Sequence, residues 1–184
     1  MYGTGARLFH WSIAAFVAVQ IPAGVAMTSE PLRAWADPLF ILHKGLGSVL
    51  LVLVVGRIAW RVTHPPPPMP EGIPEPERRM ARATHLTLYA LLLLMATSGY
   101  VRTVADGYPV ELLGALWVPP LLPRMPGLAA ASLVVHQFAV FALVVLAAVH
   151  VGAVIQRDRI DGLPILERMW PPIAPGGEAD GRDG

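Results

Sequence analysis

The chain has 184 residues, of which 54% are hydrophobic and 15% are charged, and its mean hydropathy is +0.53. Soluble domains usually carry about 25% charged residues, so this composition favours a membrane protein over a soluble domain. The net charge is only +1, and we expect membrane lipid rather than nucleic acid around the chain. The lack of cysteine excludes disulfides, iron–sulfur clusters and thiolate ligands, and leaves histidine, methionine and oxygen atoms to hold any metal.

Four apolar stretches follow one another along the chain, and each has roughly the 20 residues that a membrane-spanning helix needs. They cover residues 8–28, 39–62, 84–103 and 128–156. We therefore predict an all-α fold, an integral membrane four-helix bundle formed by residues 1–170. Residues 171–184 are rich in Gly and Asp and are predicted to be a disordered tail.

The second and third connections between these stretches have distinct compositions. Residues 65–68 are four successive prolines, a run that cannot be helical and is typical of an extended spacer. Residues 104–127 contain Trp117 and several prolines, and their aromatic and apolar content predicts a segment on the outer membrane interface.

Positive charge predicts the orientation of the bundle, because cytoplasmic segments carry an excess of Lys and Arg. Ten of the 14 such residues flank the N-terminus, the second connection and the C-terminal tail. These ten are Arg7, Arg57, Arg61, Arg78, Arg79, Arg82, Arg157, Arg159, Arg168 and Arg182. The other side holds Arg33, Lys44, Arg102 and Arg124. Both the N- and C-termini are therefore predicted to be cytoplasmic.

Two histidines, His136 and His150, lie fourteen residues apart in the last apolar stretch. Fourteen helical residues turn through about 1400°, roughly 40° short of four whole turns, so both imidazoles leave one face of the helix. The same interval separates them by about 21 Å along the helix axis. Ionisable side chains at membrane depth are costly and indicate function by default, so we predict two stacked sites.

Three further histidines extend this pattern to two levels of the bundle. With cytoplasmic termini, His43 lies near the periplasmic end of its helix and forms an outer tier with His136. His10 and His85 lie near cytoplasmic helix ends and form an inner tier with His150. We keep the names outer tier and inner tier for these two groups.

The fourteen-residue interval also selects Gly24, Arg57 and Gly99, which follow histidines on the first three helices. Glycine has no side chain, so Gly24 and Gly99 are predicted to let a flat macrocycle approach the backbone. Arg57 is predicted to point toward the inner tier, where its guanidinium could pair with a carboxylate such as a haem propionate.

Haem b fits two histidine-lined tiers inside a helical bundle. Haem sites form between facing helices of four-helix bundles, and two imidazoles close both axial positions of the iron. Such an iron transfers electrons rather than binding oxygen. We therefore predict two haem b groups that carry single electrons across the membrane.

Several short motifs together resemble the bacterial cytochrome b561 family over roughly residues 4–170. They are RLFHW at 7–11, HKGLG at 43–47, ATHLTLY at 83–89, SGY at 98–100, VH at 135–136, VHVGA at 149–153, RD at 157–158 and LERM at 166–169. Each motif is weak alone, whereas the combined set is specific.

The resemblance implies a multi-pass di-haem cytochrome of the bacterial inner membrane that passes electrons between a periplasmic partner and quinone. It implies that His10 and His150 are the axial ligands of the inner haem iron, and that His43 and His136 are those of the outer haem iron. Some members resemble superoxide oxidases, which take an electron from superoxide outside and reduce ubiquinone inside. A superoxide:quinone oxidoreductase is therefore one alternative for the activity.

Two other functions stay open on the sequence alone. One is a cytochrome b membrane-anchor subunit of a periplasmic dehydrogenase or hydrogenase complex. The other, from a different class, is a proton-coupled transporter that uses the histidines as a relay. Coloured protein favours either cytochrome, whereas the transporter predicts colourless protein.

Four polar residues have competing interpretations. His85 could contact quinone or the inner haem and donate a proton, replace His10 as a ligand, or be a plain interfacial histidine. Lys44 could snorkel to the headgroups or attract superoxide or an acidic partner. Arg57 could instead anchor its helix to an anionic leaflet. His64, beside the prolines, is interpreted as a solvated loop residue.

Overall fold

The computed structural model describes residues 1–70, 72–115 and 120–170. Four long helices account for most of them: α1 Thr4–Ala26, α2 Ala36–Thr63, α3 Glu75–Ala105 and α5 Pro126–Ile155. The short elements are η1 Glu30–Trp35, α4 Glu111–Ala115, η2 Gln156–Ile160 and η3 Leu166–Arg168. The described residues contain no strand, so the all-α prediction is confirmed.

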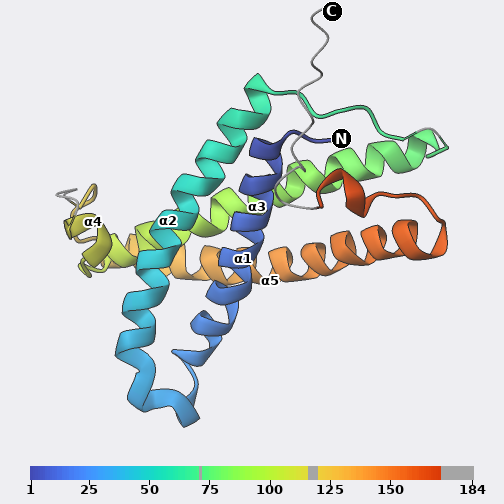
Figure 1. Ribbon diagram of the computed structural model, residues 1–184. Helices are drawn as coiled ribbons and strands as arrows, with labels where there is room; N and C mark the ends of the chain where they lie inside the picture. The colour runs from blue at the N-terminus through green and yellow to red at the C-terminus, as the bar shows by residue number, and fades with distance from the viewer. Residues whose placement is uncertain (71, 116–119, 171–184) are drawn as a thin grey trace, which may run out of the picture.

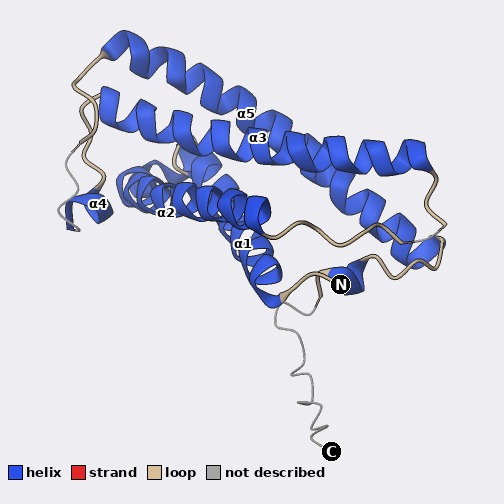
Figure 2. Ribbon diagram, turned by 90° about the horizontal axis from the view of Figure 1, so that it is seen from above, coloured by secondary structure: helices blue, strands red, loops and turns tan. Residues whose placement is uncertain are grey.

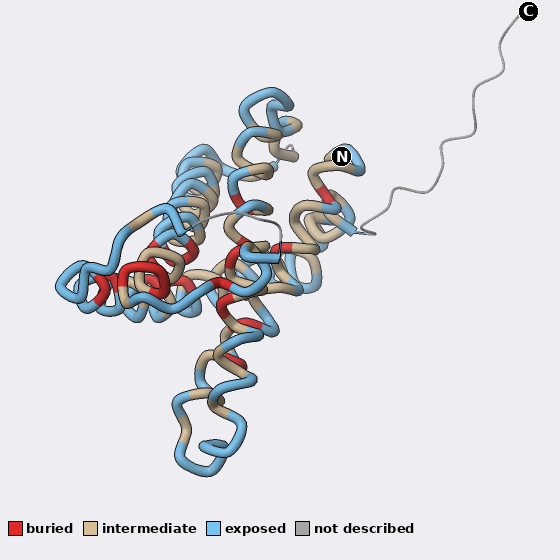
Figure 3. The backbone as a smooth tube through the Cα atoms, turned by 90° about the vertical axis from the view of Figure 1, so that its left-hand side faces the viewer, coloured by how far each residue is buried: buried red, intermediate tan, exposed pale blue. Residues whose placement is uncertain are grey.

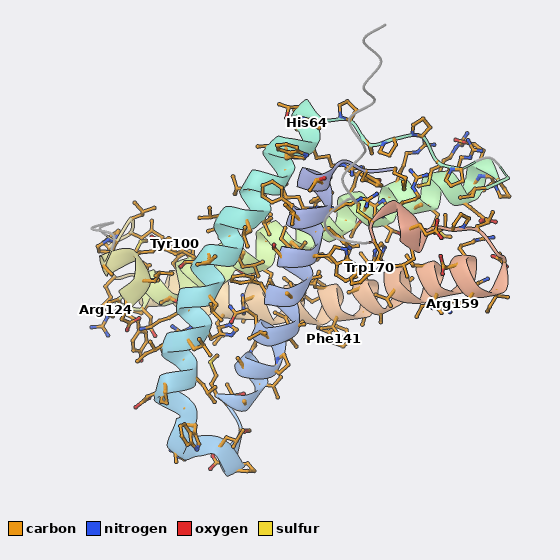
Figure 4. All side chains as sticks on the ribbon, viewed as in Figure 1. His64, Tyr100, Arg124, Phe141, Arg159 and Trp170 are labelled. Atoms are coloured by element: carbon orange, nitrogen blue, oxygen red, sulfur yellow. The ribbon has the colours of Figure 1, made fainter. Side chains whose placement is uncertain are left out.

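All four long helices are long and apolar enough to cross a membrane. Only 11–33% of each most apolar window is buried inside the protein, which leaves most of the apolar surface facing outward, as lipid requires. Figure 3 shows that exposed and half-buried residues outnumber buried ones, and that the buried residues lie where helices meet. Phe141 is one example, since it points away from the bundle and is 69% exposed (Figure 4).

The helices form two pairs that cross each other. Figure 1 shows α1 beside α2 and α3 beside α5, and Figure 2 shows the two pairs as separate layers. The layers meet where α2 packs on α3. The buried core at this crossing consists of Ile13, Leu50, Val54, Met95, Ala139 and Leu143. The expected four-helix membrane bundle is therefore present, built from two hairpins.

Helix α3 begins nine residues before the predicted span, because its first turns are stable in water. Pro76 lies in the first turn, where its missing N–H costs nothing, and the acidic residues there complement the helix dipole. Glu75 also forms ion pairs with Arg79 at 3.2 Å and Arg82 at 2.8 Å. The apolar span therefore continues from a charged helical extension rather than from a loop.

The first residues and the last described residues, 166–170, meet at one end of the bundle. The N–H of Tyr2 donates to the carbonyl of Arg168 at 3.3 Å, and Nε1 of Trp11 donates to the carbonyl of Met169 at 2.9 Å. Trp11 therefore binds the segment that contains η3. Termini on one side are what four crossings require, while the side itself stays a prediction.

The second connection agrees with expectation, because residues 65–68 lie outside any helix. Nη2 of Arg168 donates to the carbonyls of Pro67 and Pro68. The place of the third connection on the outer interface stays a prediction. Trp117 and the tail at 171–184 lie outside the described residues.

Candidate functional site

The structure brings the predicted histidines together in two pairs. In the outer tier His43 of α2 faces His136 of α5, with 6.2 Å between ring centres. In the inner tier His10 of α1 faces His150 of α5, with 6.5 Å between ring centres. Helix α5 packs chiefly on α3, so these imidazoles reach across the space between the two layers.

The separation of the rings tests whether each pair could hold one metal between them. A metal–imidazole bond is about 2 Å long, and a ring nitrogen lies about 1.2 Å from its ring centre. Two imidazoles opposed across one metal therefore place their ring centres about 6.4 Å apart. Both observed separations are close to this value. Two ligands suit a metal whose other ligands come from a macrocycle, as they do in haem.

A main-chain hydrogen bond orients the imidazole of His136. Its Nδ1 donates to the carbonyl of Met95 on α3 at 2.8 Å. A carbonyl only accepts hydrogen bonds, so this contact places the ring proton on Nδ1 and leaves Nε2 with a free lone pair. Metal-binding histidines usually carry such a bond on the second nitrogen.

Gly24 and Gly99 both lie in the outer tier, each beside an imidazole. A Cβ atom on Gly99 would lie 2.9 Å from Cε1 of His136, and one on Gly24 would lie 3.1 Å from Cε1 of His43. The structure thus gives both glycines a contact with histidine. Their predicted role of admitting a macrocycle stays a prediction.

The inner tier contains a third imidazole. The ring centre of His85 on α3 lies 5.4 Å from that of His150, about 1 Å less than two imidazoles opposed across one metal require. His10 fits the opposed geometry better, so the spacing favours His10 over His85 as the partner of His150. Among the described residues, no group of three or more His, Cys, Asp or Glu side chains could hold a bare metal ion.

Arg57 lies at the inner end, as its spacing from His43 predicts. Its Nη1 donates to the carbonyl of Ala6 at 2.8 Å, and its guanidinium lies 5.5 Å from the ring centre of Tyr89. The guanidinium of Arg61 lies 5.3 Å from the same ring. A cavity of about 20 Å³ between these residues has room for about one water molecule and is too small for a quinone ring.

Lys44 differs from the expected outward cation. Its side chain is 5% exposed, and its Nζ donates to Oε1 of Glu111 on α4 at 2.5 Å. The hydrogen bond from Lys44 holds the pKa of Glu111 below its usual value. The ion pair attaches α4 to α2, so the charge of Lys44 is paired with Glu111 rather than free.

His64 stands apart from both tiers. It stacks on Trp60 with 3.9 Å between ring centres and is exposed at the end of α2 (Figure 4). This position agrees with its interpretation as a solvated residue beside the proline run.

Comparison with known proteins agrees with the motifs. The chain matches the prokaryotic cytochrome b561 family over residues 1–172. It is also 35% identical over 170 residues to cytochrome b561 homolog 2 of Escherichia coli (strain K12), covering 91% of this chain and 90% of the relative. The chain belongs to the prokaryotic cytochrome b561 family. Membership implies haem b and electron transfer, and the four apolar helices fit a multi-pass inner-membrane protein.

Sequence reasoning missed three residues that the cytochrome b561 fold brings to the tiers. Tyr89 could have been found, because it follows His85 by four residues and shares its helix face. Glu111 gave no signal, because its pairing with Lys44 depends on where α4 packs. Gln20, which is 5% exposed and donates from Nε2 to the carbonyl of His43 at 2.8 Å, had a weak signal as a lone amide in an apolar span.

Proposed function

We propose that this chain is a di-haem b cytochrome that carries single electrons across the inner membrane between a periplasmic donor and the quinone pool. The observation that carries the proposal is the presence of two opposed imidazole pairs at two levels of one membrane-embedded bundle. Residues 1–170 would form this single functional unit, with both termini in the cytoplasm.

Each histidine would have a defined task. His43 and His136 would hold the outer haem iron, and His10 and His150 the inner one. The two histidines on α5 lie about 21 Å apart along the helix, so a carrier at each level would divide the crossing into shorter steps. Haem b would supply reversible one-electron chemistry when bound, with two imidazoles from this chain holding each group.

The outer tier is suited to electron transfer without water. His43 and His136 are half-buried, and next to them lie Gln20 and Lys44, which are buried and already bonded. A dry, fixed environment limits reorganisation when charge arrives and leaves. The donor outside could be superoxide or a redox protein, and Glu111 already neutralises the buried Lys44 on that side.

The inner tier is suited to quinone reduction, which takes up protons as well as electrons. His85 has a ring nitrogen that can hold or pass a proton, and it lies beside His150. Arg57 and Arg61 give this end a positive charge that would stabilise a reduced quinone. Ubiquinone is the quinone that we propose as the electron acceptor at this end.

Electron transfer across vesicle membranes tests the proposal. The purified chain would be reconstituted with ubiquinone, and superoxide generated outside would be the probe donor. We expect haem reduction followed by quinone reduction, both abolished by a His136→Ala variant. If superoxide fails but a periplasmic redox protein co-purifies and reduces the haem, the chain acts as an anchor subunit. Colourless protein that moves protons would instead support the histidine-relay transporter and overturn the proposal.

A further inference from the structure

The ring of His136 lies against one turn of α3, which contains Met95 and, four residues later, Gly99. Its Nδ1 donates to the carbonyl of Met95, and Gly99 is the residue one helical turn beyond Met95. In an α-helix a side chain at position i+4 lies over the carbonyl of residue i. A Cβ on Gly99 would lie 3.0 Å from Nδ1 of His136, so only glycine leaves this carbonyl open to the ring.

Helix α1 repeats the arrangement opposite His43. Gly24 follows Gln20 by four residues, and a Cβ on Gly24 would lie 3.5 Å from Nδ1 of His43. Nδ1 of His43 is buried and has no hydrogen-bond partner, and the backbone of Gln20 lies beside it. The glycine on α1 therefore faces its histidine as the glycine on α3 does, at a distance about 0.5 Å longer.

Gln20 also fixes the two helices against each other at this point. Its Nε2 donates to the carbonyl of His43 at 2.8 Å and would lie 3.2 Å from a Cβ on Gly47. This contact holds the main chain of Gln20 beside the ring of His43. A buried N–H without an acceptor is costly. A hydrogen bond from Nδ1 of His43 to the main-chain carbonyl of Gln20 would therefore be stabilising.

We infer that the main-chain carbonyls of Gln20 and Met95, each exposed by a glycine four residues later, are the acceptors that position the two outer-tier histidines. Gly24 and Gly99 are thus positioning residues that act through the imidazoles. The inference rests on the proposed function, because its consequence is an outer haem held by two histidines that both donate from Nδ1.

The inner tier provides an internal reference. Among the described residues, His10 and His150 form no hydrogen bond to a main-chain carbonyl. A hydrogen bond from Nδ1 makes an imidazole a more basic ligand, which favours the oxidised iron and lowers the midpoint potential. Losing that bond should therefore raise the potential of the outer haem and leave the inner haem unchanged.

The test compares Gly99→Ala, Gly24→Ala and the control Gly45→Ala in purified protein. Gly45 lies at the same level, and the nearest atom to a Cβ there is 4.0 Å away. Haem per chain and the midpoint potential of each haem would be measured by spectroscopic redox titration. Gly99→Ala is expected to lower the affinity for the outer haem about 10- to 100-fold. Gly24→Ala, with the looser contact, should keep that haem and raise its potential.

The outcomes separate this inference from the proposed function. Normal outer-haem content and an unchanged potential in both variants would overturn the inference while the two haems stand. Equal shifts in both haems would also overturn it, because they would indicate a general change in the bundle. If Gly99→Ala fails to fold, Gly24→Ala decides alone. A wild-type chain without haem between His43 and His136 would overturn the proposed function itself.

Discussion

The outer and inner tiers each contain an opposed pair of imidazoles, and the two pairs have different surroundings. In the outer tier, carbonyls, glycines and the amide of Gln20 surround His43 and His136. In the inner tier, His10 and His150 have a third imidazole and an arginine nearby. The first environment fixes the rings, and the second adds groups that can move protons and stabilise anions.

Under the proposed function, this difference corresponds to a division of labour within one bundle. A site that only passes electrons works best with rigid, dry ligands, whereas a site that reduces quinone also needs proton donors and positive charge. Helix α5 joins the two because His136 and His150 leave one face of it. The tiers should therefore respond separately to substitution.

Removal of a histidine from either tier should give the largest effect. His136→Ala is expected to remove roughly one of two haems per chain and leave the inner one, and His150→Ala should do the reverse, because each ring is one of two axial ligands. Haem quantitation with a reduced-minus-oxidised spectrum measures both. Loss of both haems from both variants, in folded protein, would show that the tiers are not separate sites.

Replacement of His85 should separate proton transfer from haem binding. His85→Ala is expected to keep both haems and slow quinone reduction on the order of 100-fold, since a positioned acid typically contributes that much. Stopped-flow reduction of a quinone analogue measures the rate, with Tyr89→Phe as a control on the same face. Loss of the inner haem would instead make His85 the ligand in place of His10.

Arg57 should affect the inner tier alone. Arg57→Met removes a positive charge that favours the reduced haem, so the inner midpoint potential should fall while the outer one stays constant. It also removes the hydrogen bond to Ala6, worth about 1 kcal/mol of unfolding free energy. Redox titration and thermal unfolding measure the two effects. A shift in the outer potential would contradict the proposed placement of the charge.

The ion pair between Lys44 and Glu111 should give the smallest effect, confined to the docking of α4. The pKa of Glu111 is lowered in the folded state, so its stabilisation is present above the ordinary value of 4.5 and is lost as pH falls through the lower folded value. Glu111→Gln should lower Tm by roughly 2 °C at neutral pH. In the wild type, Tm should fall by this amount as the pH drops below 4.5, whereas the Glu111→Gln variant should lack that fall.

The sequence predicted the helices and the histidine tiers because both depend on local periodicity. Hydropathy located all four spans, and the fourteen-residue interval placed His136 and His150 on one face of α5. The extension of α3 to Glu75 was missed because a hydropathy pattern stops at the first charged residue. Its capping acids and ion pairs were nevertheless visible in the sequence.

The contacts that position the tier histidines could not be predicted from the sequence. The bond from His136 to the carbonyl of Met95 depends on how α5 packs on α3, and the main chain carries no residue-specific signal. The burial of Lys44 likewise depends on where α4 lies. Spacing and helix direction grouped the histidines as the structure groups them, and only the packing of the helices gave His136 its hydrogen-bond partner.

The haem-to-protein ratio of the purified wild-type chain, from cells well supplied with haem, tests the central claim most directly. The account predicts about two haem b groups per chain, both low-spin with two imidazole ligands by electron paramagnetic resonance. Folded, pigment-free protein would contradict it, and so would a wild-type chain with only one haem that both His136→Ala and His150→Ala retain.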